Sequence, residues 1–255
     1  MGSIRVGVIG ATGRMGRTVC DAVVAADDLE LVAAVDVHGG EVIQGLEVSS
    51  DLKSVVEASC DVVVDFTTAE AARETLPFLA RHGIHAVVGT TGFDDRDLLA
   101  FESAFDASPA NCLIAANFAI SAVLMMRFAA EAAAFFDSAE IIELHHDEKI
   151  DAPSGTALAT AQAMVPRASG WAEDPTQVEE PVGSRGGLGP NGVRIHSVRM
   201  RGMTAHQEVI LGAQGQTLTI RQDSYDRTSF MPGVVLACRN IGGASGLTIG
   251  LDALL

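Results

Sequence analysis

The first residues of the chain carry the feature that most restricts its fold. An apolar segment, Ile4 to Ile9, runs directly into the turn Gly10-Ala11-Thr12-Gly13-Arg14-Met15-Gly16, and a helical pattern follows to about Ala26. A strand, a glycine turn and a helix in succession are the setting of a dinucleotide-binding fingerprint, because the N–H groups at a helix start face a pyrophosphate. The spacing is Gly-x-x-Gly-x-x-Gly and not the usual Gly-x-Gly-x-x-Gly. The motif alone therefore leaves an ordinary glycine turn equally open.

The alternation of strand and helix continues through the first half. Strand patterns cover 31–35, 61–66, 84–88 and 112–116, and helical patterns cover 69–81, 94 to about 106, and 119 to about 136. Apolar strands that alternate with helices predict an α/β fold, a Rossmann-type doubly wound parallel sheet covered on both faces. The second strand ends in Asp36, 20 residues beyond Gly16. A carboxylate there suits an adenosine ribose hydroxyl, although it could be a plain polar strand end.

The composition and the secondary-structure pattern of the sequence change after about residue 166. Prolines and glycines are frequent from Pro166 to Gly192, and strand patterns then follow at 193–200, 205–211 and 216–221. The alternation slips phase at Ser197, where we expect a β-bulge. Consecutive strands without intervening helices predict a second α+β domain built on an open mixed or antiparallel sheet.

A cluster of proton carriers follows the strand pattern that ends near Leu144. His145 and His146 leave the strand end in opposite directions, because strand side chains alternate between faces. A histidine titrates near neutral pH, and Lys149 adds three donors on a long stem. A solvated loop is the plain alternative, and a metal site that uses His145 and Glu148 is another. The chain has 17 Lys plus Arg, of which only Lys53 and Lys149 are lysine, so a lysine beside two histidines favours proton chemistry.

The segment after Lys149 predicts an anion site. Pro153 can end the extended segment, Ser154 is a good N-cap, and Gly155 and Thr156 bring backbone N–H groups to the start of a helix at Ala157. Acid-base groups beside a helix start suit a small anionic substrate.

The run from Glu143 to Ala157 resembles the signature of the 4-hydroxy-tetrahydrodipicolinate reductase (dihydrodipicolinate reductase) family, the nicotinamide-dependent enzymes of the diaminopimelate route to lysine. The glycine spacing at 10–16 is similar to that of the same family. The resemblance implies that His145 and Lys149 are catalytic and that His146, Ser154, Gly155 and Thr156 bind a small dicarboxylate. It also implies that the cofactor-binding residues are Gly10, Ala11, Thr12, Gly13, Arg14, Met15, Asp36, Gly89, Thr90, Thr91, Ala115, Ala116, Asn117 and Phe118.

The resemblance implies the reaction and the domain arrangement as well. The expected reaction is the reduction of 4-hydroxy-2,3,4,5-tetrahydrodipicolinate by NADH or NADPH. Residues 1–118 and 227–255 would form the dinucleotide-binding domain, and 119–226 the substrate-binding and oligomerisation domain of a homotetramer. Arg227 is a candidate partner for the second substrate carboxylate. Val37 and His38 follow Asp36 where members that favour NADPH often carry arginine, so we expect NADH to be preferred, with some NADPH use through Arg14 or His38.

Composition excludes other classes of function. A net charge of −16 argues against sequence-independent binding to nucleic acid or to an anionic membrane. The four cysteines are dispersed without a Cys-x-x-Cys pair, which favours buried reduced thiols over zinc or disulfides, and we expect no metal. An apolar strand at Ile4 leaves no room for a signal peptide, and the longest uncharged run reads better as strand, turn and helix than as a membrane span. We therefore expect a cytoplasmic protein.

Two other functions fit parts of the sequence. Another two-domain NAD(P)-dependent dehydrogenase would share the first domain but would not need Ser154-Gly155-Thr156 after the histidine pair, and substrate comparison separates it. A non-catalytic NAD-binding sensor would bind the cofactor without turnover, and the clustered His and Lys speak against it.

Overall fold

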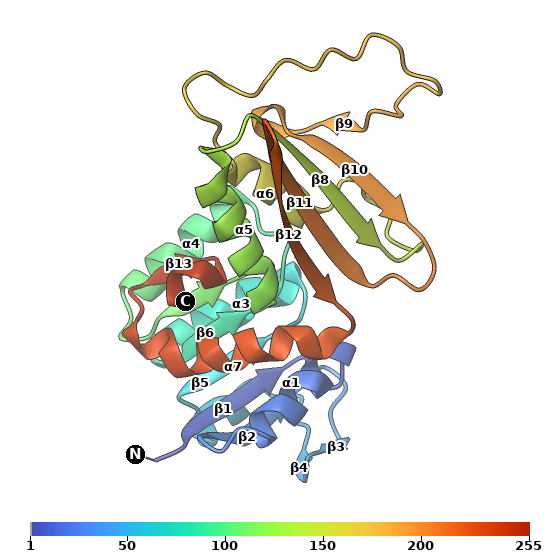
Figure 1. Ribbon diagram of the computed structural model, residues 1–255. Coiled ribbons are helices and arrows are strands. Elements are labelled where there is room, and N and C mark those ends of the chain that lie inside the picture. The colour runs from blue at the N-terminus through green and yellow to red at the C-terminus, as the bar shows by residue number, and fades with distance from the viewer. Residues whose placement is uncertain (1) are drawn as a thin grey trace. The chain divides into compact units, whose positions relative to one another are not determined.

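The computed structural model describes residues 2–255, which form two compact units (Figure 1). The first unit extends to Ile120 and resumes at Arg227, and the second spans Ser121–Asp226. The chain therefore leaves the first unit once and returns to it with its last residues.

The first unit is built on a parallel sheet of six strands in the order β13-β7-β6-β5-β1-β2. The strands are β1 (Ile4–Ile9), β2 (Leu29–Val35), β5 (Val62–Asp65), β6 (His85–Val88), β7 (Cys112–Ile114) and β13 (Leu247–Ile249). From β1 the chain adds β2 on one side and β5 on the other. The order in which strands are added thus reverses at β1. In open α/β sheets, ligands bind beyond the carboxyl ends of the strands at such a point. The predicted doubly wound parallel sheet is confirmed.

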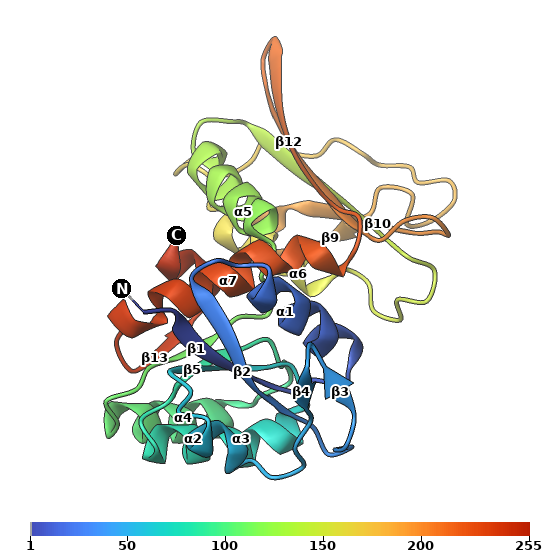
Figure 2. The same cartoon turned by 90° about the horizontal axis from the view of Figure 1, so that it is seen from below.

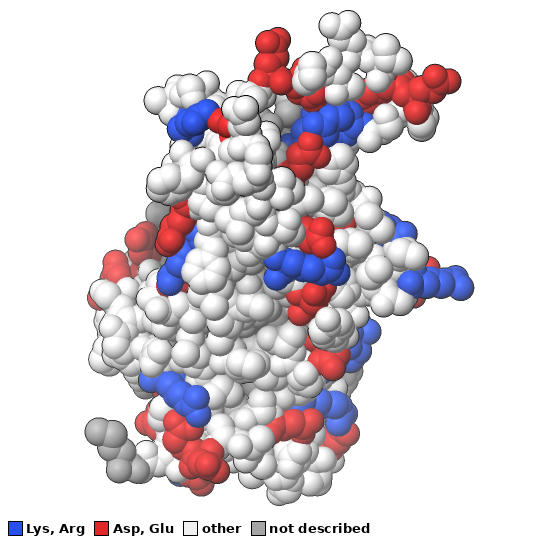
Figure 3. All heavy atoms as spheres, viewed as in Figure 1, with Lys and Arg blue, Asp and Glu red and all other residues white. Residues whose placement is uncertain are grey.

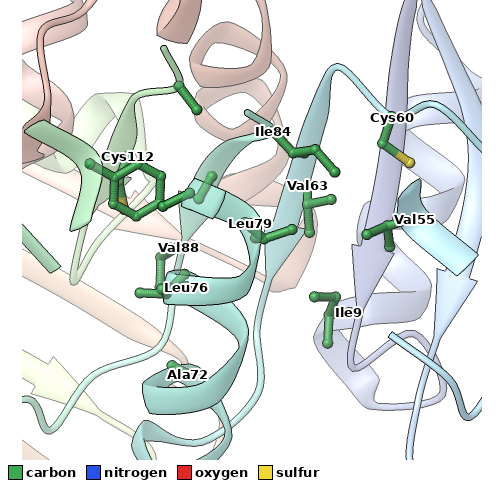
Figure 4. Packing of buried hydrophobic residues seen from close by; sticks show 14 of the residues in the cluster. Ile9, Val55, Cys60, Val63, Ala72, Leu76, Leu79, Ile84, Val88 and Cys112 are labelled. Atoms are coloured by element: carbon green, nitrogen blue, oxygen red, sulfur yellow. The ribbon is translucent and has the colours of Figure 1, made fainter. Parts of the chain in front are cut away.

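Helices cover both faces of this sheet. Figure 2 shows α1 (Arg14–Val24) and α7 (Met231–Asn240) on one face, with α2 (Ser54–Glu57), α3 (Ala69–Arg81) and α4 (Asp95–Asp106) on the other. Strand and helix side chains form the core cluster drawn in Figure 4, which includes Ile9, Val63, Leu76, Leu79 and Val88. Short segments complete the unit: a hairpin of β3 (Val42–Ile43) and β4 (Leu46–Glu47), and 3-10 turns η2 (Arg227–Phe230), η3 (Ile241–Gly243) and η4 (Leu251–Leu254).

The second unit contains a mixed sheet of five strands in the order β12-β11-β8-β10-β9. Its elements are α5 (Ile120–Ala133), β8 (Ser138–His145), α6 (Gly155–Ala163), β9 (Gly187–Leu188), η1 (Pro190–Gly192), β10 (Arg194–Arg199), β11 (Ala205–Ala213) and β12 (Gln216–Ser224). Strand β8 pairs in parallel with β10 and antiparallel with β11. The predicted second domain with a mixed sheet is confirmed.

Both helices of the second unit pack on one face of its sheet, where Met125, Ala129, Ala157 and Ala161 meet strand residues of β8, β10 and β11. In β8 this face takes Ala139 and Ile141, so the next two residues of the same parity, Glu143 and His145, also lie on it. The covered face therefore changes from apolar to polar toward the carboxyl end of β8.

The expected bulge at Ser197 is wrong. Strand β10 pairs with β8 in unbroken register from Arg194 opposite Glu140 to Arg199 opposite His145. The apparent slip in the sequence arises because the inward positions after Ile195 are Ser197 and Arg199, which meet polar partners and not the apolar core. The strand keeps its phase while the chemistry of its inward side chains changes.

Charged side chains of opposite sign lie side by side on the face drawn in Figure 3. Ion pairs in the described part of the chain include Arg221 with Asp223 and Arg73 with Asp97. Within residues 2–255, no helix is both long and apolar enough to cross a bilayer.

Candidate active site

The glycine turn after β1 explains its unusual spacing. Gly10 has a positive φ of 79°, a conformation that favours glycine, and its N–H donates to the carbonyl of Val35 on β2 at 2.9 Å. A Cβ on Gly16 would lie 2.0 Å from the carbonyl oxygen of Gly10, so only glycine allows α1 to approach the turn this closely. Gly13, between them, is the N-cap of α1. Gly10 and Gly16 are therefore required by the geometry of the turn, whereas the extended backbone of Gly13 does not by itself require glycine.

The start of α1 has the features of an anion site. No side chain caps it, and no acidic residue lies in its first turn. Arg17 is occupied, since it donates to the Thr12 carbonyl at 3.0 Å and pairs with Glu41 at 2.6 Å. Arg14 is exposed, and within residues 2–255 its side chain has no hydrogen bond or ion pair. A free guanidinium and uncapped N–H groups together fit the phosphates of a dinucleotide.

Asp36 lies immediately after β2 and is tied to the glycine turn. Its carboxylate accepts hydrogen bonds from the backbone N–H groups of Thr12 and His38, each at 3.1 Å. Burial acts to raise the pKa of Asp36, but these hydrogen bonds outweigh it and the pKa is lowered. The residue is thus held as an anion beside the turn, where a ribose hydroxyl can donate to it.

A buried carboxylate orders the segment Gly89-Thr90-Thr91 after β6. Asp65, at the end of β5, is fully buried and accepts from the hydroxyls of Thr67 at 2.6 Å, Thr75 at 2.8 Å and Thr90 at 3.3 Å. The Thr90 side chain is therefore turned inward, while Thr91 is exposed. A Cβ on Gly89 would lie 2.0 Å from the ring of Phe66, which requires glycine there.

The segment after β7 presents mostly backbone. Ala115 and Phe118 are buried, Ala116 is exposed, and the Asn117 side chain accepts from the N–H of Ala119 at 2.9 Å, one residue before α5. Like the glycine turn, Asp36 and Gly89-Thr90, this segment follows the carboxyl end of a strand. The fold thus brings all the sequence-predicted cofactor residues to one edge of the sheet.

His145 in the second unit is oriented by Glu143. Its Nδ1 lies 2.5 Å from Oε2 of Glu143, whose side chain is fully buried. Burial lowers the pKa of His145, Glu143 opposes this, and Lys149 and Arg199 add to the lowering. Since an ionised carboxylate only accepts hydrogen bonds, Nδ1 carries the hydrogen and Nε2 is left as the nitrogen that exchanges a proton.

Arg199 neutralises the buried carboxylate. Its Nη1 and Nη2 donate to the two oxygens of Glu143 at 2.9 and 2.8 Å, and Nη2 also donates to the carbonyl of Asp151 at 2.7 Å. Burial acts to raise the pKa of Glu143, but the hydrogen bonds from Arg199, Ser197 and His145 prevail and the pKa is lowered. A planar two-point pair of this kind fixes both partners.

Lys149 lies on the loop between β8 and α6, and its ammonium pairs with Asp151 at 2.8 Å. His146 is exposed, one residue beyond the end of β8. Within the described part of the chain, no group of three or more His, Cys, Asp and Glu side chains is arranged to hold a metal ion.

The start of α6 is capped by a serine and follows a buried carboxylate. Ser154 is the N-cap, and its hydroxyl accepts from the N–H of Ala157 at 3.2 Å. Because Ser154 is buried, its hydroxyl mainly caps the helix, whereas Gly155 is exposed and Thr156 half-buried. The N–H of Ser154 donates to Oε1 of Glu143 at 3.3 Å, so one carboxylate contacts both His145 and the helix start.

Glu143 and Arg199 were missed as site residues from the sequence. For Glu143 a signal existed. It lies two residues after Ile141 in the same strand, so its charged side chain must lie on the same covered face of the sheet. For Arg199 no local signal existed, because its partner lies 56 residues away.

Comparisons with known proteins agree with this architecture. The model of the N-terminus of dihydrodipicolinate reductase matches residues 4–118, and that of its C-terminus matches 121–255. The 4-hydroxy-tetrahydrodipicolinate reductases of Corynebacterium aurimucosum and Nocardia farcinica are 51% and 52% identical, and each alignment covers 99% of both chains.

A solved structure is similar over the whole length. Dihydrodipicolinate reductase from Paenisporosarcina sp. TG-14, described as dipicolinate-bound, matches with a TM-score of 0.89 and 37% identity, over 99% of this chain and 100% of that one. Two family models that together span nearly the whole chain, and full-length relatives at half identity, confirm the resemblance of the 143–157 signature. The chain belongs to the dihydrodipicolinate reductase family.

Proposed function

We propose that the protein reduces 4-hydroxy-2,3,4,5-tetrahydrodipicolinate to 2,3,4,5-tetrahydrodipicolinate, with loss of water, in the diaminopimelate route to lysine. Relatives named for this reaction match over their full length, and family membership makes the chain an NAD(P)H-dependent oxidoreductase. The observation that carries the proposal is the fully buried Glu143, which contacts both His145 and the start of α6.

The second unit would hold and protonate the substrate. One substrate carboxylate would lie at the start of α6, against the N–H groups of Gly155 and Thr156, where the dipole favours an anion. His145 would exchange a proton through Nε2, and Lys149 would be the second donor. His146, exposed beyond the strand end, would contact the substrate. The fit of this site to a dicarboxylate is supported by the dipicolinate-bound relative.

The first unit would hold the cofactor. A bound NADH or NADPH supplies a hydride. The pyrophosphate would lie against residues 10–15, the ribose at Asp36, and the nicotinamide side at Gly89-Thr90-Thr91 and at 115–118. We propose a preference for NADH, because Asp36 is held as an anion and would repel a 2′-phosphate. Arg14 or His38, both of which are exposed, would permit some use of NADPH.

We also propose a homotetramer in the cytoplasm. Ile142, Leu144, Val198 and Ile210 are half-buried on the sheet face opposite α5 and α6, and an uncovered face of this kind favours association. The four cysteines are buried free thiols, which suits a reducing compartment.

Turnover tests the reaction directly. The purified protein should oxidise NADH when supplied with the product of aspartate semialdehyde and pyruvate condensation, and should fail to do so with amino acids or sugars. Oxidation with a sugar or amino acid alone would indicate another two-domain dehydrogenase. Cofactor binding without any turnover would indicate a sensor.

A further inference from the structure

The deepest ionised group of the second unit is the Glu143 carboxylate. Its side chain has no exposed surface, and it accepts hydrogen bonds from three separate segments. These are His145 on β8, Arg199 on β10 and the N–H of Ser154 at the start of α6. A carboxylate is costly to bury, and a chain that needed only a filled core would place an apolar residue there.

Charged groups act on His145 from β8, β10 and the loop after β8, whereas its neighbour on β11, Ala205, is uncharged. Glu143 contributes one negative charge, whereas Lys149 on the loop and Arg199 on β10 contribute two positive charges, and Asp151 pairs with Lys149. Glu143 and Arg199 therefore act on the imidazolium in opposite senses. Their bidentate contact makes them nearly neutral as a pair, so His145 can exchange a proton without leaving an unpaired charge beside it.

We propose that Glu143 and Arg199 form a positioning pair that sets the tautomer and the proton affinity of His145 and holds the imidazole in fixed relation to the anion site at α6. Glu143 fixes the hydrogen on Nδ1 through Oε2, and fixes Ser154 through Oε1. Arg199 holds Glu143 and, through the carbonyl of Asp151, the loop that carries Lys149. Neither residue needs to touch the substrate for this role.

The pair predicts opposite pH shifts for two matched variants. In Glu143→Gln the Arg199 cation is no longer balanced, so the midpoint of His145 titration should fall. In Arg199→Gln the buried carboxylate is left to pair with the imidazolium, so the midpoint should rise. A charge within a few ångströms moves a titration midpoint by roughly one to three pH units. The double variant should return toward the wild-type midpoint, because it removes both charges.

The experiment is an NMR titration of the His145 ring in the ligand-free protein, with His145→Gln used to assign the signal, beside the pH profile of kcat/KM for each variant. We expect kcat to fall roughly a hundredfold in the single variants through misplacement of the imidazole. Midpoints that stay at the wild-type value, or that move in the same direction in both variants, would overturn the proposal. If Glu143→Gln does not fold, the upward shift in Arg199→Gln alone decides, since an unchanged or lowered midpoint there contradicts it.

The catalytic part of this inference rests on the proposed role of His145, but the NMR titration does not. Opposite midpoint shifts together with an active His145→Ala variant would reject the proposed catalysis and keep the pair. Unchanged midpoints together with an inactive His145→Ala variant would reject the positioning pair and keep the proposed catalysis.

Discussion

The ammonium of Lys149 lies 2.8 and 2.9 Å from the two carboxylate oxygens of Asp151, two residues along the same loop. This contact lowers the pKa of Asp151, so the carboxylate is anionic at neutral pH. An anionic substrate that uses Lys149 must therefore compete with Asp151 for the same cation.

Replacing Asp151 by Asn should release Lys149 and lower the KM for the substrate. Asp151 is largely exposed, and solvent screens a pair of this kind, so the change should not exceed roughly fivefold. Steady-state kinetics at low ionic strength measure it, with Asp147→Asn on the same loop as the control. A KM that rises in Asp151→Asn would show that Asp151 presents Lys149 to the substrate and does not compete with it.

The stability of the fold should decrease as the pH falls below neutral, and His145 should contribute to this. Burial lowers the pKa of His145 in the folded state below its ordinary value of about 6.5, so the unfolded chain binds more protons below that pH. Stability is then present above pH 6.5 and is lost as the pH falls toward the folded-state value. Thermal unfolding of His145→Gln between pH 7.5 and 5.5 should show a weaker pH dependence than the wild type.

The matched control for that measurement is His146→Gln, the adjacent and exposed histidine. If both variants keep the full wild-type pH dependence, the acid sensitivity comes from other groups. His85, whose pKa burial also lowers, would be the next to test.

Much of the fold could be predicted from the sequence because its first half has strong local signals. Apolar strands such as 62–65 are buried on both faces, and glycine turns mark the ends of several strands. The hydrophobic pattern and the positions of these glycines therefore predict the parallel sheet. The prediction of a bulge at Ser197 was wrong because an inward-facing position of a strand does not have to be hydrophobic. Arg199 takes one of the inward positions there and pairs with the buried Glu143, so a polar residue in that phase does not mark a bulge.

The candidate substrate-site residues could be predicted from the sequence, but the residue that holds them in place, Arg199, could not. His145 and Lys149 belong to one short signature, and Ser154 has the sequence marks of an N-cap, which the structure confirms. The contact of Arg199 with Glu143 depends on the parallel pairing of β10 with β8, and that pairing has no local sequence signal.

Cofactor choice should depend on Arg14 and Asp36. Arg14→Ala should reduce kcat/KM with NADPH roughly tenfold more than with NADH, because both cofactors have a pyrophosphate but only NADPH has a 2′-phosphate for that cation to pair with. Arg96→Ala, on the exposed side of α4, is the control. Measurements of kcat/KM for both cofactors decide the matter, and a wild-type preference for NADPH would refute the role given to Asp36.

Two hydrogen bonds to the buried Asp65 should have different effects: the one from Thr75 should mainly stabilise the fold, and the one from Thr90 should mainly support cofactor binding. Thr75→Val removes a buried hydrogen bond to Asp65 and should lower the free energy of unfolding by about 1–3 kcal/mol. Thr90→Val removes a longer contact at the strand end, so it should cost less stability but raise the KM for the cofactor. Urea unfolding and cofactor kinetics on both variants test this division, and equal effects on KM would contradict it.

We expect His145 and Lys149 to supply protons to a tetrahydrodipicolinate precursor that is reduced by a nicotinamide cofactor. The most direct measurement is coupled NADH oxidation with the condensation product of aspartate semialdehyde and pyruvate, for wild type, His145→Ala and Lys149→Ala. We predict substrate-dependent oxidation by the wild type and a fall in kcat of roughly two to four orders of magnitude in each variant. Wild-type rates in both variants would rule out proton transfer by His145 and Lys149, and no oxidation by the wild type would rule out the reductase reaction.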